Sequence, residues 1–199
     1  MIKWLYPPKQ IEVDRRKIEN LCFKGGGMKG HAFAGVYKAL EELKITSQIK
    51  RIIGSSAGAI FAGAVACRIN PDDIQKEVNE TDFTLFRDSD WGSLGKDIRI
   101  LEYYGFYQGN YFYNWYGNIL KKYIGTDRIT LLEIYNRFNI ELVITTTDLT
   151  KQRIIYMSKD NYPNLQLRDA VRRSMSIPIF YTPITEIDEN GVTHYLVDG

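Results

Sequence analysis

The sequence predicts an α/β fold with a mostly parallel central sheet and helices on both of its faces. Two segments support this prediction, because each runs from a short apolar stretch through a turn of small residues into a helix. The first begins at residues 19–24, and the second contains Ile49, Ile52 and Ile53. A β-α-β-α order is typical of parallel sheets that helices cover. The length of 199 residues and the 44% hydrophobic content suffice for one large core.

The whole chain, residues 1–199, is predicted to form a single domain, with residues 1–17 as an N-terminal extension. Pro7 and Pro8 interrupt the N-terminal segment before an apolar stretch of signal-peptide length can form. The two cysteines, Cys22 and Cys67, lie in apolar stretches and are expected to be reduced core thiols. We therefore expect an intracellular protein that is cytoplasmic or peripherally associated with a membrane.

The charge balance excludes one class of function. The chain has 26 Lys and Arg against 24 Asp and Glu, which gives a formal net charge of +2, and it contains no long basic block. Proteins dedicated to nucleic acids carry a strongly basic face, so no nucleic-acid partner is expected. No H-E-x-x-H motif, cysteine-rich cluster or acidic calcium loop occurs either. The sequence therefore predicts neither a metal site nor a cofactor.

Capping signals and apolar spacing predict the other elements. Asn70 followed by Pro71 indicates the start of a helix, and Thr130 with Glu133 forms the capping box of another. The remaining expected elements are a helix over residues 30–43, a helix over 110–123, a strand pair at 142–145 and 153–157, a helix over 167–175, and a strand over 192–197.

A Gly-Ser-Ser-Ala-Gly segment matches the G-x-S-x-G pattern between an apolar strand and a helix. A serine on so sharp a turn needs a strained backbone, and side chains two positions away would collide, so Gly54 and Gly58 suit its flanks. Ser56 is therefore a candidate nucleophile, and Ser55 and Ala57 complete the elbow. The positive end of the following helix would favour an oxyanion there. An ordinary turn that only lets the helix pack closely on the sheet is equally compatible with these residues.

A second turn is rich in glycine, and its candidate ligand-binding residues are Gly25, Gly26, Gly27, Met28, Lys29 and Gly30. It fits G-x-G-x-x-G, but a dinucleotide fold would place an acidic residue ~20 positions on, where Gly54 and Ser55 end the second strand. A P-loop would need Lys and then Ser or Thr after the last glycine, and His31 follows instead. Backbone N–H groups suited to an oxyanion remain, with Lys29 adding positive charge. A tight turn without a ligand is the alternative.

Together the two turns resemble the patatin-like phospholipase family, and the resemblance runs through nearly the whole chain. FKGGGMKG is similar to the oxyanion loop of that family, GSSAG to its nucleophile elbow, and the last two residues to the start of its D-G-G/A motif. ITTTDL and RRSMSIPIFY are similar to segments between them. The resemblance implies a patatin-like fold related to the α/β hydrolases, with Ser56 as nucleophile and Asp198 as general base. It also implies that the N–H groups of Gly26, Gly27 and Met28 bind the oxyanion, and that the domain is truncated at its C-terminus.

The two histidines fit a Ser-Asp-His triad poorly. His31 lies in the first turn of a helix, and His194 precedes Asp198 by four residues on the same expected strand. The α/β hydrolases have the order serine, acid, histidine. A dyad would instead rely on partial desolvation of the carboxylate and on a helix end that favours the alkoxide. Asp198 is also compatible with a plain acidic residue at the end of a strand.

Residues 103–116 contain nine aromatic side chains in 14 positions. Tyrosine and tryptophan suit a membrane interface or the rim of an acyl-chain pocket. Their i, i+3, i+4 spacing from Phe112 onward favours a helix packed over the edge of the sheet. Arg172 and Arg173 could meet a phosphate headgroup, although arginine pairs on an exposed helix face are commonly just solvated.

These patterns predict a lipid acyl hydrolase of the phospholipase A or lysophospholipase type, which cleaves carboxylic esters of glycerophospholipids through an acyl-Ser56 intermediate. Its expected partners are a phospholipid or lysophospholipid substrate and a membrane surface that it meets peripherally. Two other classes stay open. One is a catalytically weak lipid-binding or interaction module of the same fold, and the other, less favoured, is a dinucleotide-binding protein.

Overall fold

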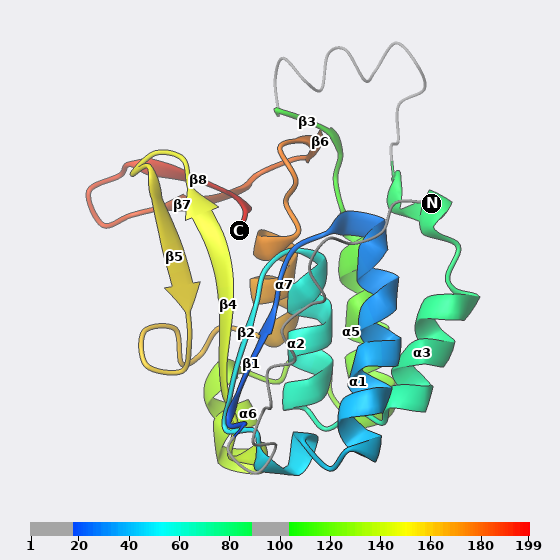
Figure 1. Cartoon of the computed structure of the whole chain (residues 1–199). Helices are drawn as coiled ribbons and strands as arrows, with labels where there is room; N and C mark the ends of the chain where they lie inside the picture. Colours follow the sequence, from blue (N-terminus) through cyan, green and yellow to red (C-terminus); the bar gives the residue numbers. More distant parts are fainter. Residues whose placement is uncertain (1–17, 89–103) are drawn as a thin grey trace, which may run out of the picture.

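The computed structural model describes residues 18–88 and 104–199, which are arranged around a central sheet (Figure 1). Its three parallel strands are β1 (Asn20–Phe23), β2 (Arg51–Gly54) and β4 (Glu141–Asp148). The register places Phe23 beside Gly54 and Gly54 beside Ile144. The turns that follow β1 and β2 therefore leave the sheet next to each other. The predicted β-α-β-α beginning is confirmed.

Three antiparallel strands complete the sheet: β5 (Arg153–Met157), β7 (Ile184–Ile187) and β8 (Thr193–Asp198). The strand order is β1-β2-β4-β8-β7, and β5 also pairs with β4. β4 pairs with β2 through its first half and with β8 through its second, where Thr146 lies opposite Asp198. The expected strands at 142–145, 153–157 and 192–197 are confirmed. The predicted mostly parallel sheet is in fact mixed: parallel pairing is confined to β1, β2 and β4, whereas β4 pairs antiparallel with β5 and β8, and β7 pairs antiparallel with β8.

A second sheet consists of two short parallel strands that the sequence analysis did not predict. These are β3 (Gly105–Tyr107) and β6 (Ile179–Tyr181). Figure 1 shows them beyond the end of the central sheet to which β1 and β2 point. Three-residue strands carry too little periodicity to be recognised from sequence.

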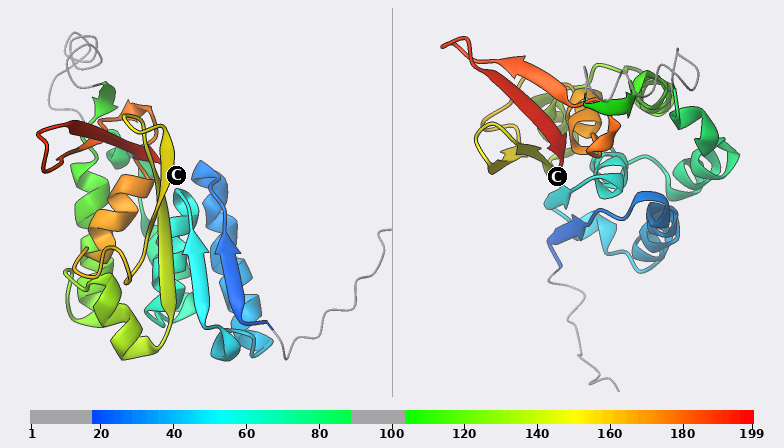
Figure 2. Two further views of the ribbon diagram at one scale, coloured as in Figure 1. Left: turned by 90° about the vertical axis from the view of Figure 1, so that its left-hand side faces the viewer. Right: turned by 90° about the horizontal axis from the view of Figure 1, so that it is seen from above.

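The helices gather on one face of the central sheet. Figures 1 and 2 show α1, α2, α3, α5 and α7 on that face and α6 near the start of β4. The α-helices are α1 (Ala32–Glu42), α2 (Ala57–Ala66), α3 (Pro71–Glu80), α5 (Asn110–Ile124), α6 (Leu131–Phe138) and α7 (Leu167–Ser174), and the 3-10 helices are η2 (Gly27–His31), η3 (Thr46–Gln48) and η4 (Phe83–Phe86). None of these described helices is long and apolar enough to cross a membrane.

Helices on both faces were expected, but the described residues place them on one. The opposite face is more polar where the strands begin, with Asn20, Arg51 and Glu141 in register. Farther along that face, Ile53 and Val143 are half-buried. Side chains alternate between the two faces of a strand, so Leu21, Ile52 and Leu142, which lie in register, point toward the helices.

Both predicted capping signals are present. The Asn70 side chain accepts a hydrogen bond from the Asp72 N–H at 2.9 Å, and Pro71 is the first residue of α3. The Thr130 hydroxyl accepts a hydrogen bond from the Glu133 N–H, and the Glu133 carboxylate accepts one from the Thr130 N–H. These contacts satisfy backbone groups that have no partner inside a helix, and they set the start of α3 and α6.

α2 is apolar around its whole circumference, and all ten of its residues are buried. It packs against β1, β2, β4 and α7. Glycines permit this close contact. A Cβ on Gly54 would lie 2.5 Å from the Ala62 Cβ, and a Cβ on Gly58 would lie 2.1 Å from the Phe23 carbonyl oxygen. The two flanking glycines of the G-x-S-x-G pattern therefore bring α2 directly onto the sheet.

The aromatic segment is partly buried in its described part, residues 104–116. Phe112 and Tyr116 are fully buried on α5, as its spacing predicted. Tyr104 and Tyr111 are exposed.

The two cysteines are free thiols. Cys67 is a buried core residue, as expected, and burial raises the pKa of its thiol to about 12. Cys22 is exposed and not a core residue. It alternates with the buried Phe23 on β1 and so belongs to the face without helices.

The contact between α2 and β1 leads to a stability prediction. Gly58→Ala is expected to lower the free energy of unfolding by about 3 kcal/mol or more, because the new Cβ would overlap the Phe23 backbone. Gly35, on α1, is a matched helical control, since a Cβ there would meet nothing within 4 Å. Gly35→Ala is expected to stabilise the protein by ~0.5–1 kcal/mol. Urea denaturation measures both, and equal stability of the two variants would contradict this account.

Candidate active site

Ser56 occupies the turn between β2 and α2, immediately before the first residue of the helix. Its φ is 53° and its ψ is −130°. A positive φ is uncommon outside glycine, and residues held in such conformations cluster at functional sites. The residue is 6% exposed. The turn therefore holds Ser56 in a strained conformation beside the positive N-terminal end of α2.

The Ser56 hydroxyl donates a hydrogen bond to Asp198, with 2.6 Å between Oγ and Oδ2. Asp198 ends β8, which pairs with β4, and β4 pairs with β2 just before Ser56. The Asp198 N–H also donates to the carbonyl oxygen of Ser176 at 2.9 Å. The sheet thus brings together two predicted site residues that lie 142 positions apart.

The environment of Asp198 changes its acidity. Burial raises the pKa of the carboxyl group above its ordinary value, and the hydrogen bond from Ser56 partly offsets this by lowering it. A carboxylate with a raised pKa accepts a proton more readily than an exposed one. A hydroxyl directly hydrogen-bonded to such a carboxylate is the arrangement of a nucleophile and its base.

The glycine-rich turn lies against the same serine. A Cβ on Gly25 would lie 3.1 Å from the Ser56 Cβ and 3.8 Å from its Oγ, so a side chain there would crowd the serine. No described residue accepts a hydrogen bond from the N–H of Gly25 or Gly26. Gly27 has a φ of 53°, in the left-handed region that favours glycine, and begins η2. Of these residues, Gly25 lies beside the Ser56 hydroxyl.

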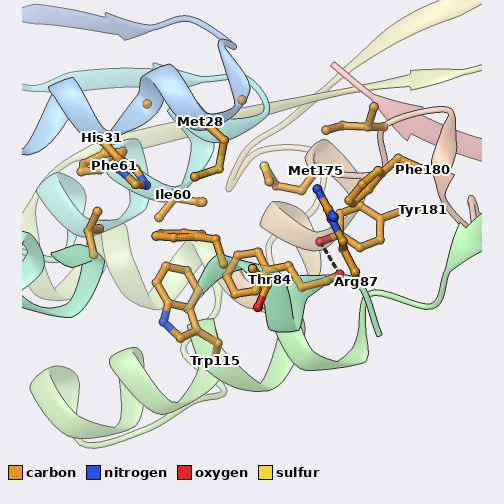
Figure 3. Close-up of a pocket in the computed structure, with 17 residues that line it drawn as sticks. Met28, His31, Ile60, Phe61, Thr84, Arg87, Trp115, Met175, Phe180 and Tyr181 are labelled. Carbon is orange, nitrogen blue, oxygen red and sulfur yellow. Dashed lines mark hydrogen bonds between the residues drawn. The ribbon is translucent and has the colours of Figure 1, made fainter. Parts of the chain in front are cut away.

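The other residues of this turn contact different parts of the protein. The Lys29 N–H donates to the Gly26 carbonyl at 3.1 Å, which closes the turn. Gly30 is buried against α2, where a Cβ would lie 2.9 Å from the Ala57 Cβ. Met28 is 60% exposed and lines an adjoining cavity (Figure 3).

This cavity has a volume of about 430 Å³ and is almost entirely apolar. It reaches the serine at Met175, whose sulfur lies 3.9 Å from the Ser56 Oγ. Figure 3 shows Met28, Ile60 and Met175 facing Trp115 across it. Besides Met28 and Met175, its larger apolar side chains are Ile60, Phe61, Val78, Phe83, Phe86, Trp115, Ile177, Phe180 and Tyr181.

Apart from residues of the two glycine turns and the aromatic segment that contains Trp115, the sequence analysis did not identify the residues of this cavity. Phe83 and Phe86, on η4, have only an i, i+3 spacing as a local signal. Met175 lies in the RRSMSIPIFY segment, but nothing in that segment assigns it a role. The cavity is built from η2, α2, α3, η4, α5 and the residues after α7, so no single stretch of sequence contains its pattern.

The histidines have other contacts. His194 is buried between two carboxylates, with Nδ1 3.0 Å from Asp148 Oδ2 and Nε2 3.2 Å from Asp188 Oδ2. His31 lines the cavity and packs its ring against an aromatic side chain of η4. Within the described part of the chain, no hydrogen bond links either histidine to the serine or the aspartate.

The two arginines of α7 have partners within the protein. Arg172 is buried, and its guanidinium donates to the Ser176 hydroxyl at 2.6 Å and to the Gln108 carbonyl at 2.5 Å. Arg173 pairs with Glu186 at 2.5 Å. The interpretation of Arg172 as a solvated side chain on an exposed face is therefore wrong. Residues 18–88 and 104–199 contain no group of three or more His, Cys, Asp or Glu side chains that could hold a metal.

The patatin-like phospholipase family model matches residues 21–199 of the chain. The chain belongs to the patatin-like phospholipase family. It is 31% identical to YqhO, an uncharacterised protein of Bacillus subtilis, over 89% of this chain and 61% of YqhO. This patatin-like chain therefore spans about three fifths of the length of that curated relative.

Solved structures share the fold of this patatin-like chain. VipD from Legionella pneumophila matches with a TM-score of 0.68 and 18% identity, over 91% of this chain and 45% of VipD. A chain of the complex between full-length SpcU and full-length ExoU from the type III secretion system of Pseudomonas aeruginosa matches with a TM-score of 0.56 and 20% identity, over 80% of this chain and 38% of that one. The predicted patatin-like α/β fold is confirmed.

The raised pKa of Asp198 leads to a prediction about stability and pH in this patatin-like chain. The folded protein binds a proton at Asp198 more readily than the unfolded chain does, so the ionised carboxylate destabilises the fold at neutral pH. Asp198→Asn is therefore expected to be more stable than the wild type near neutral pH. The difference should shrink as the pH falls below the raised pKa. Urea denaturation across a pH series measures this.

Asp188 provides a control of opposite sign. Hydrogen bonds from the Val192 N–H and from His194 lower its pKa, so its ionised form stabilises the fold above the unfolded pKa and this contribution is lost as the pH falls. Asp188→Asn should thus be less stable than the wild type near neutral pH. If Asp198→Asn and Asp188→Asn changed the free energy of unfolding in the same direction near neutral pH, this electrostatic account would be contradicted.

Proposed function

We propose that this protein hydrolyses carboxylic esters of lipids, as a phospholipase A or lysophospholipase, with Ser56 as nucleophile and Asp198 as general base. The observation that carries the proposal is the 2.6 Å hydrogen bond between their side chains, next to an apolar cavity. Membership of the patatin-like phospholipase family supports the same class of substrate.

The reaction proceeds in two halves. Ser56 Oγ attacks the ester carbonyl carbon while its proton passes to the Asp198 carboxylate, and the carbonyl electron pair forms an oxyanion. Collapse of this intermediate breaks the bond to the alcohol oxygen, which takes the proton from Asp198 and leaves an acyl-Ser56. Water then gives a proton to Asp198, and its oxygen attacks the acyl carbon. The fatty acid leaves as Ser56 Oγ recovers the proton.

Backbone N–H groups of the glycine-rich turn bind the oxyanion. Gly25 and Gly26 have N–H groups without an acceptor among the described residues, and Gly25 lies against Ser56. Gly27 and Met28 continue the turn at the start of η2, where N–H groups have no acceptor within the helix. Fixed donors at a developing negative charge contribute strongly to catalysis, at about 10²- to 10³-fold for each donor.

The cavity binds the acyl chain. Its volume of about 430 Å³ falls within the range of small-molecule sites, and its walls are apolar side chains. An alkyl chain gains free energy from every methylene that it buries, about 0.8 kcal/mol for each. A water-soluble ester with a short acyl group would leave most of this surface unused, so the cavity favours lipid esters.

A lipid aggregate or membrane surface is the proposed peripheral partner. Met28, Leu85 and Ile179 are exposed apolar side chains on η2, η4 and β6, and other residues of these elements line the cavity. Figure 1 places β6 and the segments coloured for residues 27–31 and 83–86 toward the same end of the molecule. Apolar side chains around an acyl-chain cavity would insert into lipid as the substrate enters.

Ser56→Ala tests the proposed nucleophile. The wild type is expected to hydrolyse a lysophospholipid and to be labelled by a fluorophosphonate. Ser56→Ala should lose the label and at least 10³-fold in kcat. The matched control is Ser55→Ala, which removes the neighbouring hydroxyl and should keep the label. A folded Ser56→Ala variant that still turns over at a tenth of the wild-type rate would exclude Ser56 as nucleophile. A wild type that binds lipid without turnover or labelling would favour a binding module.

Ile60→Trp tests the acyl-chain cavity. Ile60 lines the cavity from α2, so a larger side chain there should shorten the space for the acyl chain. The ratio of kcat/KM between a long-chain and a short-chain ester is expected to fall about tenfold or more. Val36→Trp is the control, because Val36 is exposed on α1 and does not line the cavity. An unchanged ratio in Ile60→Trp would place the acyl chain elsewhere.

A further inference from the structure

The end of α7 contacts both members of the serine and aspartate pair through three consecutive residues. The Ser174 hydroxyl oxygen accepts a hydrogen bond from the Ser56 backbone N–H at 2.8 Å. The Met175 sulfur lies 3.9 Å from the Ser56 Oγ. The Ser176 carbonyl oxygen accepts a hydrogen bond from the Asp198 N–H at 2.9 Å. Ser174 and Ser176 expose no surface.

We propose that Ser174 is a positioning residue for this reaction. Its hydroxyl fixes the backbone of the nucleophile, and Ser176, two residues farther along the same segment, binds the backbone of Asp198. The proposal rests on the proposed function. Because this one segment contacts both Ser56 and Asp198, it fixes the position of each residue relative to the other. A shift of either one would change the distance between the Ser56 Oγ and the Asp198 carboxylate.

The backbone of Ser56 needs such an anchor. A residue with a φ of 53° and a ψ of −130° is strained, and strained conformations persist only where the surroundings hold them. Ser56 precedes the first turn of α2, so its N–H has no acceptor within the helix. Ser174 supplies this acceptor. Without it, the buried N–H would be left unsatisfied, and the turn would relax toward another partner and carry the Oγ with it.

The segment that carries Ser174 is itself fixed by a buried arginine. Arg172 Nη1 donates to the Ser176 Oγ at 2.6 Å, and that hydroxyl donates to the Arg172 carbonyl at 2.9 Å. Arg172 Nη2 donates to the carbonyl oxygens of Gln108 and Thr182, at 2.5 and 3.2 Å. These two residues follow β3 and β6. The guanidinium therefore ties the end of α7 to the second sheet, which gives the Ser174 hydroxyl a fixed position.

A matched pair of variants separates the hydroxyl of Ser174 from its packing. Ser174→Thr and Ser174→Val add side chains of the same shape, but only threonine keeps the acceptor. Ser174→Ala removes the acceptor without adding bulk. Thr130→Ala is the stability control, because the Thr130 hydroxyl also accepts a backbone N–H, at the start of α6. For each variant, kcat and KM for a micellar lysophospholipid, the rate of fluorophosphonate labelling and the urea midpoint are measured.

Ser174→Ala and Ser174→Val are expected to lose about 10²-fold in kcat with KM little changed, because misplaced reacting groups slow the chemical step more than they weaken binding. The kcat of Ser174→Thr should be at least tenfold higher than that of Ser174→Val. Thr130→Ala should lower the urea midpoint and keep the wild-type kcat.

Three results would overturn the proposal. One is a kcat of Ser174→Ala within twofold of the wild type. Another is equal kcat in Ser174→Thr and Ser174→Val, which would assign Ser174 to packing alone. In both cases Ser56 would still be labelled, so the proposed function would stand. A wild type that neither hydrolyses the lipid nor accepts the label would instead overturn the proposed function, and the positioning role with it.

Discussion

The hydrogen bond between the Ser56 hydroxyl and the Asp198 carboxylate sets the conditions that the rest of the structure meets. It can serve proton transfer only if the carboxylate stays ionised while part of its hydration is removed. Burial and the bond itself act on the pKa of Asp198 in opposite directions, and burial is the larger effect. The bond also requires Ser56 to keep a conformation that it would not adopt alone. The fold must therefore supply partly dry surroundings and a fixed backbone.

Close contacts at glycine residues do much to fix the backbone around Ser56. Gly54 and Gly58 let the buried helix α2 rest directly on the sheet, where a Cβ on Gly58 would overlap the Phe23 carbonyl. Gly25 lets the turn after β1 pass beside Ser56. The turn between β2 and α2 is thus enclosed on three sides. These are the end of β1 at Phe23, the glycine-rich turn that follows it, and the end of α7 at Ser174. Side chains at Gly54 and Gly58 would push α2 away from the sheet and so displace Ser56.

The sequence predicted the features that depend on neighbours within a few residues. The caps at Asn70 and Thr130, the turn around Ser56 and the buried face of α5 are of this kind, because their contacts lie within one or two turns of chain. Local patterns could not predict features that depend on distant partners, and the pairing of Ser56 with Asp198 was expected only from the family resemblance. β3 and β6 are three residues each and pair across more than 70 positions. Ser174 meets Ser56 across 118 positions. Nothing local distinguishes it from Ser176, and only the fold shows which of the two reaches the turn.

Met175 is a wall of the cavity and also a neighbour of the Ser56 hydroxyl. On the proposed function, an acyl chain that fills the cavity displaces water from this wall. Loss of water lowers the local dielectric, which strengthens both the bond to Asp198 and the bonds from the glycine N–H groups to the oxyanion. Part of the free energy of burying the chain thereby appears in the transition state instead of in binding alone. An ester with a short acyl group does not fill the cavity, so water stays in contact with Met175. Preference for long acyl chains then follows from the electrostatics of the serine and aspartate pair as much as from the shape of the cavity.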